Sequence, residues 1–463
     1  MDHLQKSNVS ASPFVFSKTW KIGTLVYTSA GLVSLCFWLL WGDFAWNMKE
    51  RAVTPMAQLI LKQLNASDLM VGLLVGSLPA AIGFFLGPVI GVMSDRHRGR
   101  WGRRIPFIFI PIPFITISML GIAFAQVMAH FFHSHLGPFS PGESVLIFVT
   151  FGFFWTVFEV ATVVANTVFG GLINDVVPSE VIGKFFGLFR AVSLIAGIIF
   201  NFWLMGKAEA YTTEIFVVIG IFCGAGMLLM CWKVKEGGYP SAHAVHHADG
   251  RNFFESSKSY IKECYSDSYY LWIFVAMALG NMAAAPVNSF CIFYAKSLGI
   301  EMDLYGKYIA LTFVVSLFLS YFLGMLADRF HPLRVGMISI FFYMIMMLWG
   351  GVYALDKETF TIAFLAHGIL SGTYFTCTAS LAQRLFPKEK FGQLASAGGI
   401  LGGLSYVVLP PLIGKLLDMT GHVYRYTFIF SGLISFLTLF SFLIVYRKFK
   451  KLGDFRHYSP PLE

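Results

Sequence analysis

Twelve long apolar stretches dominate this chain and leave few folds open to it. A helix crosses a hydrocarbon core of about 30 Å with about 20 apolar residues, and each stretch is of that order or longer. The stretches lie near residues 22–61, 69–93, 105–126, 143–168, 186–206, 212–232, 269–295, 306–326, 334–354, 360–382, 393–417 and 424–446. Their apolar residues run continuously, which does not fit membrane β-strands. The sequence therefore predicts an all-α membrane protein with 12 transmembrane helices.

The composition argues against soluble proteins. Hydrophobic residues make up 56% of the 463 residues and charged residues 13%, whereas soluble domains carry about 25% charged residues. A soluble enzyme, a disordered protein and a nucleic-acid-binding protein are therefore poor interpretations. The six cysteines are scattered without a C-x-x-C motif, and no nucleophile–base pair or phosphate-binding loop is evident. We accordingly expect no enzymatic activity, no metal site and no cofactor.

Lysine and arginine are concentrated in alternate loops. Of the 34 Lys and Arg, 24 fall in the loops on the side of both termini, seven fall on the opposite side, and three lie inside apolar stretches. Loops rich in Lys and Arg stay in the cytoplasm, so both termini are expected to be cytoplasmic. The first apolar stretch is too long for the core of a signal peptide, and we expect a multi-pass protein of the cell membrane.

The chain divides into halves with six apolar stretches each. The motif G-x-x-x-D-R occurs at 91–96 and 324–329, and P-x-E-x-x-G occurs at 178–183 and 387–392. Two motifs in the same order at equivalent loops indicate a 6+6 repeat, which is how major facilitator transporters are built. The expected segments are a cytoplasmic N-terminal tail (1–21), an N-terminal six-helix bundle (22–232), a cytoplasmic central loop (233–268), a C-terminal six-helix bundle (269–447) and a cytoplasmic C-terminal tail (448–463).

The first of these motifs predicts a gate. Its glycine would let two helices approach closely, and its aspartate, at a helix end, can pair with arginine. We expect the motif to latch the two halves together in one state and to release them in the other, although the charges could also serve only to set the topology. The residues of the predicted gating loops are Gly91, Asp95, Arg96, Arg100, Arg103, Arg104, Gly324, Asp328 and Arg329.

Polar residues follow one face of the first stretch. Asp43, Asn47, Glu50 and Thr54 recur at i, i+4, i+7 and i+11, which is helical spacing. Residues after Thr54 are too apolar for a loop, so we expect one displaced helix from about 30 to 61, with these charges at mid-depth. The alternative is a span that ends near residue 41 and an external loop. Ionisable groups inside a membrane are costly and usually functional.

Similar stripes occur on the fourth, seventh and tenth stretches, and lipid cannot satisfy such groups. The sequence therefore predicts a central polar cavity between helices 1, 4, 7 and 10. Its predicted lining residues are Trp46, Asn47, Arg51, Trp155, Asn166, Asn281, Asn288, His367 and Tyr374. The residues predicted to couple transport to protons are Glu159, Glu50 and Asp43. The alternative is that the charges form a structural ion-pair cluster and that His367 and the amides only join helices.

Two segments carry a resemblance to a known group. The segment 88–108 is similar to the signature S-D-R-x-x-x-R-x-G-R-R-x-P-F-I, and 43–55 matches an acidic residue, Phe, an aromatic residue and a Thr-Pro pair. On these residues the chain resembles the glycoside and sucrose:cation symporters of the major facilitator superfamily. The resemblance implies that helices 1 and 4 line a sugar cavity, and it points to Asp43 and Glu159 for sugar contact and protonation. Gly170 stands where the sucrose branch carries an arginine.

The function expected from these features is secondary active transport of a small polar solute. We expect a proton-coupled symporter of a sugar or glycoside that works by alternating access, as a monomer in the lipid bilayer. Two alternatives are a proton-coupled antiporter that exports metabolites or drugs, and a non-transporting sensor on the same fold. The partners expected are a glycoside, a coupling proton and lipid, without nucleic acid.

Overall fold

The computed structural model describes residues 19–238, 260–387 and 390–461. The predicted N-terminal tail and central loop lie largely outside these residues. Within them, twelve helical segments are long and apolar enough to cross a membrane, as the sequence predicts. A short hairpin, β1 (Trp20–Ile22) and β2 (Leu25–Tyr27), precedes the first of them.

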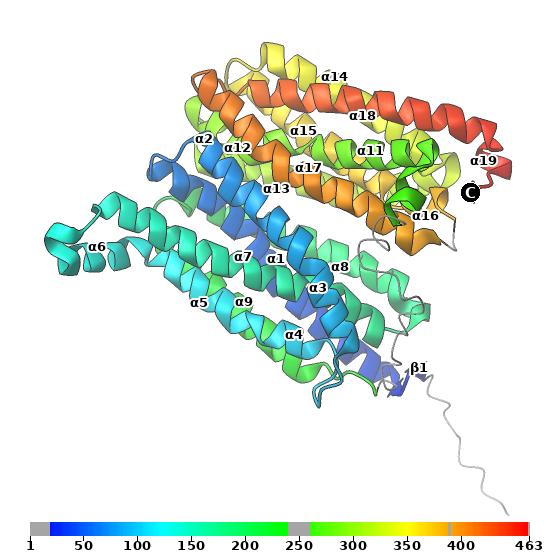
Figure 1. Cartoon of the computed structure of the whole chain (residues 1–463), viewed down its shortest axis with the longest axis horizontal. Coiled ribbons are helices and arrows are strands. Elements are labelled where there is room, and N and C mark those ends of the chain that lie inside the picture. The colour runs from blue at the N-terminus through cyan, green and yellow to red at the C-terminus, as the bar shows by residue number, and fades with distance from the viewer. Residues whose placement is uncertain (1–18, 239–259, 388–389, 462–463) are drawn as a thin grey trace, which may run out of the picture.

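Six spans form an N-terminal bundle (Figure 1). The first three spans are α1 (Ser29–Gln63); α2 (Asp68–Val71), η1 (Gly72–Ser77) and α3 (Leu78–Arg96); and α4 (Ile105–Phe109) and α5 (Pro111–Ala123). Helices α6 (Ala125–Leu136) and η2 (Gly137–Phe139) follow the third span. The next three spans are α7 (Glu143–Val176); α8 (Ser179–Ile199), η3 (Phe200–Leu204) and η4 (Met205–Lys207); and α9 (Thr212–Lys233).

The other six spans form a C-terminal bundle beside the first (Figure 1). Its helices are α11 (Ser268–Met282) and α12 (Ala285–Ser297); α13 (Met302–Phe330); α14 (Pro332–Tyr353); α15 (Lys357–Thr378) and α16 (Leu381–Leu385); α17 (Phe391–Met419); and α18 (Tyr426–Lys451), followed by the short α19 (Asp454–His457).

The first span is a single helix, as the sequence predicts. Helix α1 begins after Thr28, whose side chain accepts the N–H of Gly31, and continues through Pro55 to Gln63. Its 35 residues, at 1.5 Å each, exceed what the hydrocarbon core requires. The polar positions after Asp43 therefore belong to one continuous membrane-spanning helix and not to a loop.

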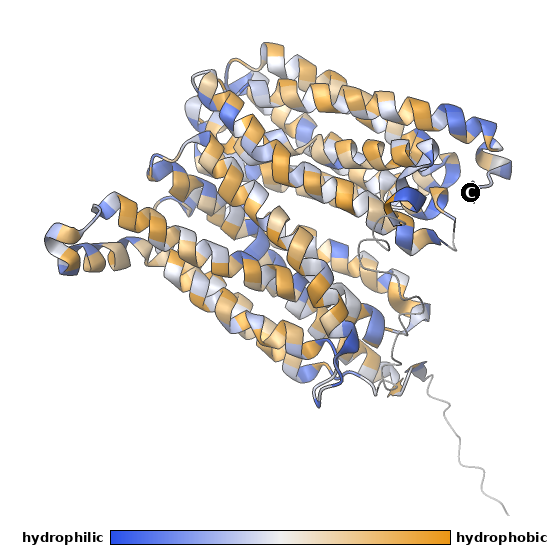
Figure 2. Cartoon of the chain, viewed as in Figure 1, coloured by the Kyte–Doolittle hydropathy of each residue, from blue (hydrophilic) through white to orange (hydrophobic). Residues whose placement is uncertain are grey.

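The surface of the spans is apolar. Figure 2 shows hydrophobic residues along the helices and hydrophilic residues gathered at their ends and in the loops. Large apolar side chains such as Phe85 and Phe318 are more than 70% exposed, which in water would be costly. In a membrane protein these side chains face lipid.

The two bundles meet most closely at one end. We call the end that holds β1 and α19 the terminus side, and the opposite end the far side. The segments α2 and η1 pack on α17, and η3 and η4 pack on α13, all toward the far side. In Figure 1 the bundles diverge toward the terminus side.

Candidate functional site

A buried lysine is the centre of the charged cluster on α1. Lys49 is fully buried, and its ammonium donates to Glu50 at 2.5 Å and to the Thr162 hydroxyl on α7 at 3.4 Å. The ammonium also lies 3.7 Å from the ring centroid of Trp46 and 5.1 Å from that of Phe158. Aromatic faces and a carboxylate together stabilise a cation that has lost its water.

Glu159 of α7 lies beside this ammonium. Its neighbours Phe158 and Thr162 both contact Lys49, and its charge interacts with those of Lys49 and Glu50. The side chain is buried. Within the described part of the chain, no hydrogen bond or ion pair satisfies its carboxyl group. A buried carboxyl group without a partner is suited to bind a proton.

A second group of polar residues joins α1 to α8. The Asn47 amide donates to Asp43 Oδ1 at 2.7 Å and accepts from the Ser193 hydroxyl at 2.7 Å. Arg51 donates to Ser193 at 3.4 Å, and its guanidinium lies 4.8 Å from the ring of Phe313 in the other bundle. Among the residues that the structure describes, Asp43 Oδ2 and Arg51 Nε are buried and find no hydrogen-bond partner. The group therefore spans the bundle interface with unused hydrogen-bonding capacity.

The charges of the whole cluster do not balance. We name Asp43, Lys49, Glu50, Arg51 and Glu159 the α1–α7 cluster. Three carboxylates against two cations leave one excess negative charge when every group is ionised. One bound proton makes the cluster neutral, which is favourable in a low dielectric.

The C-terminal bundle contributes a buried hydrogen-bonded histidine. His367 of α15 lies 2.9 Å from the Tyr343 hydroxyl of α14 and 3.1 Å from Asn288 Oδ1 of α12. Asn281 and Asn288 are exposed, whereas Tyr374 is buried with its hydroxyl against Gly280. His367 thus joins three helices, and the two asparagines present amides at the bundle surface.

The two tryptophans of the predicted cavity are in the core of the N-terminal bundle. Trp155 is buried, donates to the Leu74 carbonyl at 2.8 Å and stacks on Phe151. Trp46 is buried beneath Lys49. Neither ring has an open face for a solute in this conformation. Asn166 is exposed on α7.

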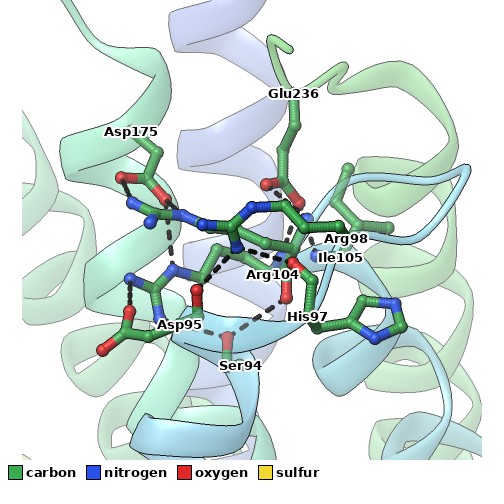
Figure 3. A network of polar contacts seen from close by, with 9 residues as sticks. Ser94, Asp95, His97, Arg98, Arg104, Ile105, Asp175 and Glu236 are labelled. Atoms are coloured by element: carbon green, nitrogen blue, oxygen red, sulfur yellow. Dashed lines mark hydrogen bonds and ion pairs between the residues drawn. The ribbon is translucent and has the colours of Figure 1, made fainter. Parts of the chain in front are cut away.

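The predicted gating loop of the N-terminal half forms a network of its own (Figure 3). Arg103 binds Asp175 at the end of α7 through two hydrogen bonds of 2.8 and 2.5 Å, and Arg104 reaches the same carboxylate at 3.1 Å. Arg104 also pairs with Asp95 and donates to Ser94 at 3.1 Å. The loop between α3 and α4 is therefore held to α7 within one bundle.

Both motif aspartates pair inside their own bundles. Asp95 pairs with Arg104, and Asp328 pairs with Arg384 at 3.0 Å. The expected role of the motif glycines is wrong for this conformation, because a Cβ at Gly91 or Gly324 would meet nothing within 4 Å. Arg96, Arg100 and Arg329 are exposed. No latch between the bundles involves these residues in the described structure.

The sequence analysis does not predict a charged cluster that the structure shows on the far side. The Asp418 carboxylate accepts the N–H groups of Asp68 and Leu69 at 2.8 and 2.9 Å. Asp68, fully buried, lies 2.5 Å from the Lys62 ammonium and 2.7 Å from His422 Nδ1. We name Lys62, Asp68, Asp418, His422 and Tyr424 the far-side cluster. The only signals in the sequence are Asp68 at a helix start and the i, i+4 pair Asp418 and His422.

The polar groups of the far-side cluster form hydrogen bonds and ion pairs with one another. The Tyr424 hydroxyl donates to Asp68 at 3.2 Å, and burial, with the Asp68 carboxylate beside it, raises the pKa of Tyr424. Ligand atoms of Asp68, Asp418 and His422 lie within 4.8 Å of one another, so these three could share a metal ion. The Lys62 ammonium already neutralises Asp68, which favours an ion-pair cluster over a metal centre.

The sequence and fold are similar to those of known transporters. The sequence profile of the Major Facilitator Superfamily matches residues 33–351 and, in a second match, residues 271–457. The multi-drug resistance efflux pump PmrA homolog of Lactococcus lactis subsp. lactis (strain IL1403) is 22% identical over 407 residues, which cover 86% of this chain and 91% of that protein.

Solved structures share the fold at low identity. The nucleoside transporter NupG gives a TM-score of 0.64 at 13% identity, over 89% of this chain and 99% of that one. The inward open xylose transporter XylE from E. coli gives 0.61 at 14% identity, over 90% and 95%. The bacterial homolog of the human lysosomal transporter Spinster, inward-facing and unoccupied, gives 0.61 at 14% identity, over 93% and 98%.

Proposed function

Because this chain belongs to the Major Facilitator Superfamily, we propose that it is a secondary active transporter that moves a small, uncharged polar solute together with a proton. Membership in this superfamily confirms the predicted fold class. The chain is a multi-pass membrane transporter and not an enzyme. The proposal adds the coupling ion, the solute class and the residues responsible.

The observation that carries the proposal is the excess negative charge of the α1–α7 cluster. Glu159 is buried beside Lys49, and within the described residues neither of its oxygens has a hydrogen bond, whereas Asp43 accepts the Asn47 amide on one oxygen. We therefore assign the proton to Glu159. When Glu159 loses the proton, Lys49 can be shared between Glu50 and Glu159. Proton binding and the position of Lys49 are therefore linked.

The polar groups that remain available suit the hydroxyls of a sugar. Asn166, Asn281 and Asn288 are exposed amides. Asn166 and Asn281 offer donors and an acceptor, and Asn288, whose Oδ1 lies 3.1 Å from His367, offers its NH₂ donors. Amides bind neutral hydroxyls without adding charge to the cluster. The solute we propose is a glycoside or another sugar, and the similarity of the fold to that of a xylose transporter is compatible with this proposal.

The contacts between the bundles support alternating access. The far side is closed by Asp418 on Asp68 and by close packing of α17 on η1, whereas both motif aspartates on the terminus side pair within their own bundles. We propose that this is the state open toward the terminus side, which we expect to be cytoplasmic because Lys and Arg are in excess there.

The test is proton movement in vesicles. Purified full-length protein is reconstituted with an internal pH dye, and a panel of glycosides is added outside. Symport of one sugar acidifies the lumen in either orientation of the protein. Glu159→Gln should abolish that signal but keep exchange of labelled sugar, because the neutral amide mimics the protonated acid. Glu143→Gln, at the exposed start of the same helix, is the control and should behave as wild type.

A second candidate function is export by proton antiport. It is favoured by the match to a multi-drug resistance efflux pump homolog over 91% of that protein. The same vesicles separate the two functions by sign, since solute entry by antiport makes the lumen alkaline. Full proton uptake by Glu159→Gln would refute the role of Glu159 in either case.

A further inference from the structure

We propose that a cavity in the N-terminal bundle binds the headgroup of an anionic phospholipid. The cavity lies at the terminus side, on the face of the bundle that points away from the C-terminal bundle. The cavity has a volume of about 770 Å³. We name it the outer pocket and define it by Arg98, Arg100, Trp101, Phe109, Trp232 and Lys235, which are among its lining residues.

The outer pocket faces lipid and not the other bundle. It lies between the loop after α3, the start of α4 and the end of α9, and Figure 1 places α4 and α9 on the side of the bundle away from the C-terminal helices. Trp232 is 72% exposed and Trp101 59% exposed. Tryptophans that are this exposed at the end of a span mark the membrane–water interface.

The polar lining of the outer pocket is positive. Arg98, Arg100 and Lys235 are exposed cations, and Glu236 is the one carboxylate among the lining residues. The Glu236 oxygens accept the N–H groups of Arg103, Arg104 and Ile105 at 2.7 to 3.0 Å (Figure 3). That carboxylate binds the start of α4, and the lining residues that the structure describes carry three cations against this one carboxylate. A phosphate group is the complementary ligand.

The guanidinium of Arg98 is held in place at the mouth of the pocket. It donates to the carbonyls of Asp95 and His97 at 2.6 and 2.8 Å. A fixed guanidinium loses less side-chain entropy when it binds an oxyanion than a mobile one does.

The remaining walls of the pocket are apolar. They favour the phosphate of a phospholipid over free inorganic phosphate as the ligand. Ile105, Phe109 and Val234 line the cavity together with the two tryptophan rings. Free phosphate would use only the cations, whereas a phospholipid places its phosphate on the cations and its glycerol and first acyl carbons on the apolar walls. The terminus-side leaflet, expected to be cytoplasmic, is also the leaflet where basic pockets meet anionic lipids.

The proposal is tested by tryptophan quenching in vesicles. Wild-type protein is reconstituted in phosphatidylcholine with a minor share of brominated phosphatidylglycerol or brominated phosphatidylcholine. Tryptophans elsewhere on the surface are quenched equally by the two brominated lipids. Stronger quenching by brominated phosphatidylglycerol than by brominated phosphatidylcholine therefore measures the headgroup preference of the outer pocket. Arg100→Gln/Lys235→Gln should lower that preference about thirtyfold, at about 1 kcal/mol for each cation removed. The control Arg447→Gln/Lys451→Gln removes two exposed cations of the same side from α18 and should retain it.

Three outcomes would overturn the proposal. They are equal quenching by the two lipids, an equal loss in the control variant, and displacement of brominated phosphatidylglycerol by millimolar inorganic phosphate, which would assign the site to free phosphate. All substituted side chains are exposed, so both variants are expected to fold, and their elution as monodisperse protein verifies it. The result does not depend on which solute the protein carries.

Discussion

The carboxylate of Asp418 caps the helix that begins at Asp68, although the two residues belong to different bundles. One Asp418 oxygen accepts the Asp68 N–H at 2.8 Å and the other accepts the Leu69 N–H at 2.9 Å. A helix N-terminus leaves its first amides unsatisfied and carries partial positive charge. The cap therefore forms only when the far side is closed, and it stabilises that state selectively.

Asp418→Ala should shift the protein toward the state that is open on the far side. Loss of a capping carboxylate costs about 1–2 kcal/mol, which is roughly a tenfold change in the ratio of two states. The readout is the pulsed EPR distance between spin labels at Phe139 and Leu355, two exposed residues in far-side loops of different bundles. A longer distance should gain population.

The matched control for this variant is Asp356→Ala. Asp356 caps α15 within one bundle by accepting the N–H groups of Glu358 and Thr359 at 3.0 and 2.9 Å, and these bonds lower its pKa. Its removal weakens a far-side helix end without touching the bundle interface. An equal change in the label distance for both variants would contradict a selective role for Asp418.

Gly414→Ala should disfavour the closed far side by a steric route. A Cβ at Gly414 would lie 2.2 Å from the Asp68 carbonyl oxygen, and a Cβ at Gly72 would lie 2.5 Å from that of Pro410. Backbone atoms cannot yield cheaply, so the bundles must separate. The same EPR distance should lengthen for Gly414→Ala and Gly72→Ala. Gly83→Ala, with open space beside it, is the control and should leave the distance distribution unchanged.

The sequence predicts the spans and the charged helix well because both follow from the membrane itself. Lipid offers no hydrogen bonds, so apolar length predicts the helices and the polar spacing from Asp43 to Thr54 predicts one continuous α1. Because Lys49 lies inside an apolar stretch, the sequence also indicates that its charge needs partners in the folded protein. The choice of Glu50, Thr162 and the Trp46 ring depends on how α1 and α7 pack, which no local pattern encodes.

The far-side cluster could not be predicted for the same reason. Asp68 and Asp418 are 350 positions apart, and in the sequence each looks like an ordinary polar residue at a helix end. In this conformation the motif glycines are not the ones at a close approach between helices, because a motif does not show which glycine has a crowded Cα. Gly91 and Gly324 are open, whereas Gly72 and Gly414, outside that motif, meet backbone atoms of the other bundle.

His331 should make the stability of the C-terminal bundle depend on pH. His331 is buried between α13 and α14, and its Nδ1 accepts the N–H of Leu333 at 3.2 Å. Burial, with Arg384 and Arg334 nearby, lowers the pKa of His331 from 6.5 to about 4. Between those values the unfolded chain binds a proton that the folded chain excludes, so the free energy of unfolding falls as the pH drops from 6.5 to 4.

The magnitude of this effect is about 3 kcal/mol, from 1.36 kcal/mol for each pKa unit. His331→Asn keeps a side-chain acceptor and tolerates the positive φ of 75° at this position, and it should remove most of the pH dependence of thermal unfolding in detergent. His135→Asn, an exposed far-side residue, is the control. A pH profile for His331→Asn that matches wild type would assign the acid sensitivity to other groups.

Lys49→Met should destabilise the N-terminal bundle more than the double variant Lys49→Met/Glu50→Gln does. The single change removes the cation that pairs with Glu50 and lies beside Glu159, and breaking a buried pair costs about 3–5 kcal/mol. Glu50 is 43% exposed, which keeps the cost at the low end of that range. The double change removes one orphaned charge and should recover a large part of the stability. Thermal unfolding of wild type, both single variants and the double variant gives the coupling energy. Additive effects would mean that Lys49 is held only by Thr162 and the rings of Trp46 and Phe158 and takes no part in the charge balance of the cluster.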